Sequence, residues 1–152
     1  MSGWGEAVPQ GRKNPLSAGV VVVRRIHDEW HYLLLCSFQY WDFPKGLVEA
    51  GELPLAAAQR EVAEESALTN LRFHWGVDYC ETPPYGQYRK IARYYLAESP
   101  EGMVELLVNP ELGLPEHDEF CWVDQVRAET LLAPRVQPVL RWAAALLSGQ
   151  SA

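Results

Sequence analysis

The order of apolar and polar residues predicts a strand hairpin near the start of the chain. Residues 17–26 contain the β-branched run Val20-Val21-Val22-Val23, which is typical of a buried strand. His27-Asp28-Glu29 then forms a polar turn. Residues 30–37 return with the apolar run Tyr32-Leu33-Leu34-Leu35, so the two segments read as a β-hairpin.

A loop and then a helix are predicted next. Residues 40–51 are punctuated by Pro44, Gly46 and Gly51, which indicates a loop. Residues 54–68 form the helix, because Pro54 suits a first turn and good helix formers follow it. One stripe of this helix carries Leu55, Gln59, Val62 and Ser66, with Ala58 beside it. The glutamates fall outside that stripe.

The second half of the chain predicts more strands and a helical end. The strands are expected at residues 71–80, 88–98, 104–108 and 119–123. Turns are expected at 81–86 and 109–115, and helices at 124–132 and 134–147. The last helix has apolar residues at helical spacing, so it packs on the body. The whole pattern predicts an α+β fold or a sandwich of helices on a mixed sheet.

Composition narrows the class of protein. A chain of 152 residues fits one domain, which we expect at residues 16–149 after a loose polar leader at 1–15. No run approaches the length of a membrane span, so we expect a cytoplasmic protein that does not bind membranes. Three widely spaced cysteines are expected to be free thiols. The net charge of -7 argues against long nucleic acid but not against a nucleotide.

Three glutamates of the predicted helix form the most informative cluster. Glu61 and Glu65 stand one turn apart on the same face, and Glu64 lies beside them. Like charges at this spacing cost a few tenths of a kcal/mol on a solvated helix, and more where the face is buried. A divalent cation would remove that repulsion. The alternative is a solvated acidic face with Arg60 as its intrahelical partner.

The spacing around this helix resembles the Nudix box, G-x5-E-x7-R-E-U-x-E-E-x-G-U, where U is apolar. The matching residues are Gly46, Glu52, Arg60, Glu61, Val62, Glu64, Glu65 and Leu68. Ala67 stands where the family has Gly. A left-handed helix end is easy for Gly and costly for Ala, so we expect the helix to end differently here, with the metal face intact.

The resemblance implies a Nudix hydrolase with an αβα sandwich fold and a Mg²⁺ cofactor, with Mn²⁺ also suited to hard oxygen ligands. It implies metal binding by the Gly46 carbonyl and by Glu61, Glu64 and Glu65, with Glu52 as a supporting residue. It implies that Arg60 orients the neighbouring carboxylates. A metal-activated water would attack phosphorus, with a carboxylate as general base, so Glu61, Glu64 and Arg60 are expected to be catalytic.

The flanking segments resemble the dinucleoside tetraphosphate (Ap4A) hydrolase branch of this superfamily. Residues 41–46, Trp-Asp-Phe-Pro-Lys-Gly, and 94–98, Tyr-Tyr-Leu-Ala-Glu, carry the likeness. It implies phosphate contacts by Lys45 and Lys90, with Arg89 and Arg93 as weaker alternatives to Lys90. Tyr85 or Tyr88 would suit adenine stacking. The alternatives are a surface loop lysine at position 45 and tyrosines that simply pack on the sheet.

The segment 116–122 resembles the E-H-x-x-Y/F-x-W element of the same branch. It implies that Glu116 is an additional metal ligand or the general base. Glu119 is the next candidate, and the alternative is a solvated acidic loop. Pterin- and nucleoside-triphosphate-cleaving relatives share the element, so it discriminates poorly between substrates.

The resemblance implies a nucleotide polyphosphate as substrate and three possible functions. The first is asymmetric cleavage of Ap4A to ATP and AMP. The second is pyrophosphate cleavage in nucleoside triphosphates, nucleotide sugars or RNA 5′ ends. The third is a nucleotide sensor without activity, which the presence of Glu61, Glu64 and Glu65 counts against. The protein is expected to be a monomer or a homodimer.

Overall fold

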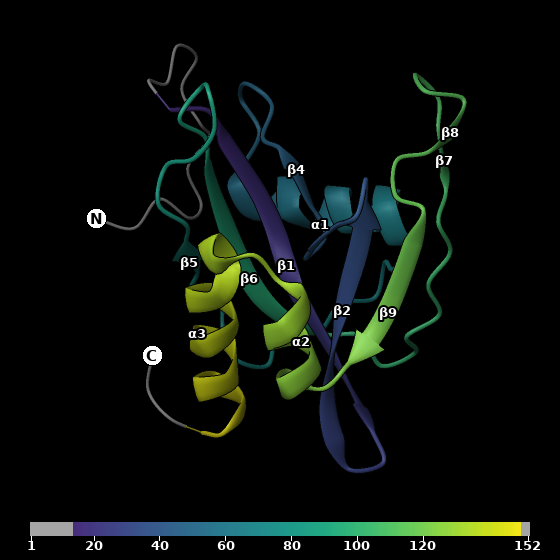
Figure 1. The fold of residues 1–152 in the computed structure, drawn as a ribbon, viewed down its shortest axis with the longest axis vertical. Coiled ribbons are helices and arrows are strands. Elements are labelled where there is room, and N and C mark those ends of the chain that lie inside the picture. Colours follow the sequence, from purple (N-terminus) through teal and green to yellow (C-terminus); the bar gives the residue numbers. More distant parts are fainter. Residues whose placement is uncertain (1–13, 150–152) are drawn as a thin grey trace.

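The protein is a mixed β-sheet covered by helices on both faces, as described for residues 14–149 in a computed structural model. Helix α1 (Pro54–Ser66) crosses one face of the sheet, and α2 (Gln125–Leu131) and α3 (Gln137–Leu147) cover the other (Figure 1). This arrangement confirms the predicted αβα sandwich and α+β fold class.

The sheet is built around a parallel pair of long strands. Strand β1 (Leu16–Ile26) runs beside β6 (Ile91–Glu98), and the pairing extends from Leu16 and Ile91 to Val23 and Glu98. The remaining strands of this sheet are β2 (Glu29–Ser37), β3 (Tyr40–Asp42), β4 (Lys45–Leu47), β5 (Cys80–Glu81) and β9 (Glu119–Val123). The sheet order is β3-β2-β1-β6-β5, with β4 also paired to β1 and β9 to β2.

Strand β1 supplies core residues to both faces of the sheet. Val21 and Val23 lie in the core under α2 and α3, whereas Val20 and Val22 lie in the core under α1. All four side chains are fully buried. The continuous apolar run of this strand follows from that position, because a strand covered by helices on both faces has no solvent side.

The closing helices begin where the sequence predicts them. The Asp124 carboxylate accepts a hydrogen bond of 2.9 Å from the Arg127 N–H and caps α2. The predicted helix at 134–147 starts as a 3-10 turn, Pro134–Val136, and continues as α3. Residues 1–13 of the predicted leader lie outside the described residues. Asn14 and Pro15 hydrogen bond to the chain at Arg89 and Ile91.

Two predicted strands are wrong, although their alternating pattern is real. Within residues 71–80, Arg72 bridges to Glu98 and Cys80 starts β5, while the rest forms turns and irregular chain. Leu71, Phe73 and Tyr79 still pack on the core, and the residues of 71–79 alternate between partly buried and exposed. The prediction for 104–108 fails in the same way, because Val104 and Leu106 pack inward without a strand partner and only the last residue enters β7.

Three predicted boundaries also change. The loop at 40–51 contains the short strands β3 and β4, because residues on both sides of Phe43 pair with β2 and β1. The loop at 109–115 is a small hairpin of β7 (Val108–Asn109) and β8 (Leu114–Pro115). The strand at 88–98 starts at Ile91, because the preceding residues form a turn closed by Tyr85 and Lys90.

The expected change in helix termination at Ala67 is wrong. Ala67 adopts the left-handed conformation, with φ 66° and ψ 7°, that glycine would favour there. The surrounding contacts dictate this end of the helix. Leu68 is buried, and the Ser66 carbonyl accepts a 2.9 Å hydrogen bond from the Glu105 N–H, so the chain must leave α1 in one direction.

Replacing Ala67 with glycine should therefore stabilise the protein. The left-handed conformation costs an L-residue roughly 1–2 kcal/mol, which exceeds the entropy that glycine loses, so Ala67→Gly should raise the free energy of unfolding by about 1 kcal/mol. Urea unfolding followed by circular dichroism measures it. The matched change inside the helix, Ala63→Gly, should lower stability by about 1 kcal/mol. Equal losses in both variants would contradict a strained Ala67.

Candidate metal and phosphate site

Packing of α1 on the sheet determines which glutamates are buried. Ala57, Ala58 and Val62 are fully buried under the sheet and fix the rotation of the helix. Glu65 is consequently carried inward and is 8% exposed. The Glu61 side chain is 13% exposed, whereas the Glu64 side chain is 58% exposed at the rim.

Strand β4 provides the opposite wall of the site with its backbone. The Lys45 N–H donates a 3.1 Å hydrogen bond to Glu65 Oε1. A Cβ atom at Gly46 would lie 2.0 Å from the Glu61 carboxylate, so any larger residue here would force that carboxylate to move. Glycine therefore lets the Gly46 backbone lie against the carboxylate predicted to share its metal.

Arg60 ties the acidic residues together at the edge of the site. Its guanidinium donates to both Glu52 oxygens at 2.8 and 2.9 Å, to Glu61 at 2.7 Å and to Glu64 at 3.2 Å. It also donates to the Leu47 carbonyl at 3.1 Å. The hydrogen bond from Arg60 lowers the pKa of Glu52 and keeps it ionised. The structure thus places Glu52 as the partner that holds Arg60.

The loop between β8 and β9 brings a second set of ligands to the same place. Oxygen and nitrogen atoms of Glu65, Glu116 and His117 lie within 4.8 Å of one another. A pocket between α1 and this loop is lined by Glu61, Glu64, Glu65, Glu116 and His117 together with Leu106, Leu107, Asn109 and Pro115. His117 was not predicted as a site residue. Its position directly after Glu116 in the E-H-x-x-F element was the available signal.

The electrostatics of this cluster disfavour an ionised Glu65. Burial, with repulsion from Glu116 and Glu61, raises the pKa of Glu65 to about 9. Burial also raises the pKa of Glu61 and lowers the pKa of His117. A neutral imidazole and several carboxylates in one pocket form a donor set that fits a hard divalent cation. A cation there would offset the repulsion and stabilise the ionised carboxylates.

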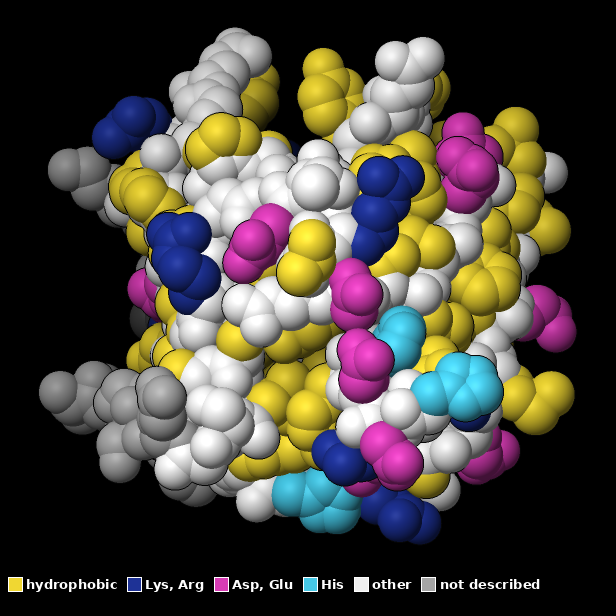
Figure 2. All heavy atoms as spheres, turned by 60° about the horizontal axis from the view of Figure 1, so that its bottom comes forward, with side chains coloured by type: hydrophobic (Ala, Val, Ile, Leu, Met, Phe, Trp, Pro, Cys, Tyr) yellow, Lys and Arg dark blue, Asp and Glu magenta, His cyan; other side chains and the backbone are white. Residues whose placement is uncertain are grey.

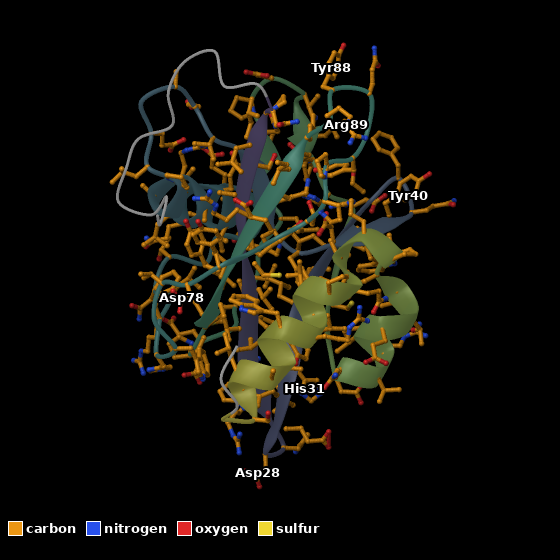
Figure 3. The ribbon with its side chains drawn as sticks, turned by 90° about the vertical axis from the view of Figure 1, so that its left-hand side faces the viewer. Asp28, His31, Tyr40, Asp78, Tyr88 and Arg89 are labelled. Atoms are coloured by element: carbon orange, nitrogen blue, oxygen red, sulfur yellow. The ribbon has the colours of Figure 1, made fainter. Side chains whose placement is uncertain are left out.

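The predicted substrate-binding residues lie in two places. Lys45 lies beside the acidic cluster, and its Nζ is 3.9 Å from Asp42 Oδ2. Tyr85, Tyr88 and Lys90 belong to the 85–90 turn and do not line the glutamate pocket formed by the described residues. Tyr88 is 65% exposed and projects from the tip of that turn (Figure 3). One face of the Tyr85 ring is covered by the Arg135 guanidinium, at 4.1 Å from the ring centre.

The surface gives no sign of a basic face for long nucleic acid on the side shown in Figure 2. Positive and negative side chains are scattered there among apolar ones. All three cysteines are free, as predicted. Within residues 14–149, no helix combines the length and apolar character needed to cross a membrane.

Glu65 should make the stability of the metal-free protein depend on pH. Its folded pKa of about 9 lies above the ordinary value of 4.5, so the folded state holds a proton more tightly than the unfolded state. The resulting stabilisation is present at low pH and is lost as the pH rises between these two values. In EDTA, Glu65→Gln should therefore flatten the fall in melting temperature between about pH 6 and pH 9. Glu101→Gln, an exposed control, should keep the parental slope, and equal slopes in all three proteins would contradict this assignment.

Comparison with known proteins identifies the family and the fold. The NUDIX domain family model matches residues 13–143. A crystal structure of a C. elegans Ap4A hydrolase binary complex is similar with a TM-score of 0.77 and 26% identity, covering 89% of this chain and 98% of that one. The E. coli dihydroneopterin triphosphate pyrophosphohydrolase shares the fold, with a TM-score of 0.61 and 21% identity over 87% of this chain and 97% of that one.

A curated relative matches a smaller part of the chain. RNA pyrophosphohydrolase of Brucella anthropi is 31% identical over 111 residues. The match covers 63% of this chain and 63% of that protein, so it leaves more than a third of each outside. The family model alone spans most of the chain. On that match, the chain belongs to the NUDIX domain family.

Proposed function

We propose that this protein is a Mg²⁺-dependent hydrolase that cleaves Ap4A asymmetrically to ATP and AMP. The observation that carries the proposal is the convergence of ligand atoms of Glu65, Glu116 and His117 within 4.8 Å of one another, with the Lys45 backbone bonded to Glu65. The 26% identity to a C. elegans Ap4A hydrolase over nearly the whole chain supports the choice of substrate.

The residues of the site have separate tasks in this proposal. Glu61, Glu64 and Glu65, with the Gly46 carbonyl, would hold the metal. Mg²⁺ held by these residues would supply Lewis-acid chemistry toward the phosphoryl oxygens and the attacking water. Arg60 holds Glu61 and Glu64 in place through bonds of 2.7 and 3.2 Å. A carboxylate fixed in this way needs no reorganisation when substrate binds.

Glu116 is the residue we propose as the general base. It is exposed, and its Oε1 lies 3.5 Å from the Asn109 side-chain nitrogen, which is a weak contact. Its carboxylate is therefore available to take a proton from the attacking water. Glu65 is less suited to that task because it is buried and bonded to the Lys45 N–H.

Lys45 would bind the phosphate chain next to the metal. Its side chain is 24% exposed, with the ammonium 3.9 Å from Asp42, and its backbone N–H is bonded to Glu65. Lys90 and Tyr88, on the exposed 85–90 turn, would contact the more distant part of the substrate. Tyr85 is less suited to adenine stacking than Tyr88, because Arg135 covers one face of its ring.

The second candidate function is removal of pyrophosphate from RNA 5′ ends, which the relative from Brucella anthropi favours. The net charge of -7 counts against contacts with a long RNA backbone. A short 5′-triphosphorylated oligonucleotide would need only the metal site and Lys45, so the two activities share the same catalytic residues.

Cleavage in ¹⁸O-labelled water distinguishes the proposed substrate. With Ap4A and Mg²⁺, mass spectrometry should find ATP and AMP in equal amounts, with one labelled oxygen in one of the two products. Two molecules of ADP, or no label in either nucleotide, would contradict asymmetric cleavage. Triphosphorylated RNA that is turned over more than about a hundredfold faster than Ap4A at equal concentration would favour the second candidate.

Removing the central carboxylates should abolish activity without unfolding the protein. Glu61→Gln and Glu65→Gln keep the side-chain size but remove the charge that the cation needs. Each should lower kcat by roughly 10²–10⁴-fold, in the range of preorganised electrostatic groups. Steady-state assays with circular dichroism as a check on folding measure this. Glu101→Gln should retain parental kcat, and a Glu61→Gln enzyme within a few-fold of the parent would show that the ligand assignment is wrong.

A further inference from the structure

The Asp42 carboxylate lies among hydrogen-bond donors and two cationic side chains, an arrangement that the sequence alone does not predict. It lies at the end of β3 with 18% of its side chain exposed. Its Oδ1 accepts hydrogen bonds from the Phe43 N–H at 2.7 Å and the Tyr94 hydroxyl at 2.8 Å. Its Oδ2 lies 3.1 Å from Arg135 Nη2 and 3.9 Å from Lys45 Nζ. Two cations therefore face the same carboxylate oxygen.

Arg135 is the cation that is held firmly. It extends from the 3-10 turn before α3, and its guanidinium lies over the Tyr85 ring at 4.1 Å from the ring centre. Its side chain is 26% exposed. A planar guanidinium can stack on a ring and donate to a carboxylate at once, whereas a lysine ammonium does not reproduce both contacts. Arg135 thus joins the C-terminal helical region to β3 and to the 85–90 turn.

Lys45 is the cation that is held loosely. A separation of 3.9 Å from Asp42 is at the outer limit of an ion pair, and the hydrogen bonds of that carboxylate are already made by other groups. The backbone of Lys45 is bonded to the acidic pocket, because its N–H donates a 3.1 Å hydrogen bond to Glu65 Oε1. The side chain with the loosely held ammonium therefore starts directly beside that pocket.

We infer that Arg135 is a positioning residue that neutralises Asp42 and so leaves the Lys45 ammonium free to bind a phosphate of the substrate. The inference rests on the proposed function, because it assumes a phosphate at the glutamate pocket. Without Arg135, the half-buried Asp42 would lack its charge partner. Lys45, three residues away on the same short segment, would move from the outer limit of the pair into direct contact with Asp42.

The expected consequence is weaker phosphate binding with little change in the chemical step. Arg135→Gln should weaken binding about tenfold, the size of effect expected for one hydrogen bond to a charged group. The probes are an Ap4A analogue with methylene-bridged phosphates and inorganic tripolyphosphate, each measured by calorimetry with Mg²⁺. KM for the cleaved substrate should rise by a similar factor, with kcat within about twofold of the parent.

A double variant separates this effect from a general loss of structure. Asp42→Asn still offers an oxygen to the Phe43 N–H and the Tyr94 hydroxyl but cannot capture Lys45 by charge. Asp42→Asn and Asp42→Asn/Arg135→Gln should therefore bind both probes with the same affinity, close to that of the parent. Arg127→Gln is the matched control, because Arg127 is exposed on α2 and bonds to Thr130 within its own helix.

The outcomes distinguish failure of this inference from failure of the proposed function. A tenfold loss in Arg135→Gln that persists in the Asp42→Asn background would overturn the inference, as would parental affinity in Arg135→Gln. If tripolyphosphate shows the predicted pattern but Ap4A is not cleaved, the inference stands and only the proposed substrate is wrong. If the parent protein binds neither probe, Lys45 does not bind phosphate and the inference is wrong.

Discussion

The seating of α1 against β4 is the contact on which the whole site depends. The helix presents carboxylates inward, and the strand meets them with backbone alone, through the Lys45 N–H and the Cα of Gly46. Neither contact could form if the helix were rotated by one residue, because Ala57, Ala58 and Val62 fill the space beneath the sheet. An ordinary apolar interface therefore holds an electrostatically unfavourable cluster in place. The cluster suits a cation because a bound positive charge would offset the cost of burying carboxylates that repel one another.

Much of the fold follows from local sequence signals. The Val20–Val23 run, the proline-initiated helix and the amphipathic C-terminal segment each form the predicted element, because core packing and local preference agree there. The strand predictions for residues 71–80 and 104–108 are wrong because an alternation of apolar and polar residues was taken as the mark of a strand. An extended chain lying on a core buries every second residue, and only a neighbouring backbone makes it part of a sheet.

The site was predictable in the helix and less so outside it. Periodicity places Glu61 and Glu65 on one face, and the family resemblance indicates Glu116. Only the folded chain shows that Glu116 and His117 meet Glu65 from more than fifty residues away. Asp42 and Arg135 could not be paired from the sequence, because nothing in either segment indicates the other. At Ala67 the sequence was misleading, because alanine disfavours the left-handed conformation but the tertiary contacts at Ser66 and Leu68 impose it.

The parallel pairing of β1 with β6 has a consequence for the order in which the molecule assembles. The two strands lie far apart in the sequence, and α1 belongs to the chain that must be looped out before they meet. Pairings of such high contact order form slowly and late. A cation would therefore find the complete metal site only after β1 and β6 have paired. Cation binding is expected to lower the unfolding rate of the folded protein and to leave the folding rate nearly unchanged.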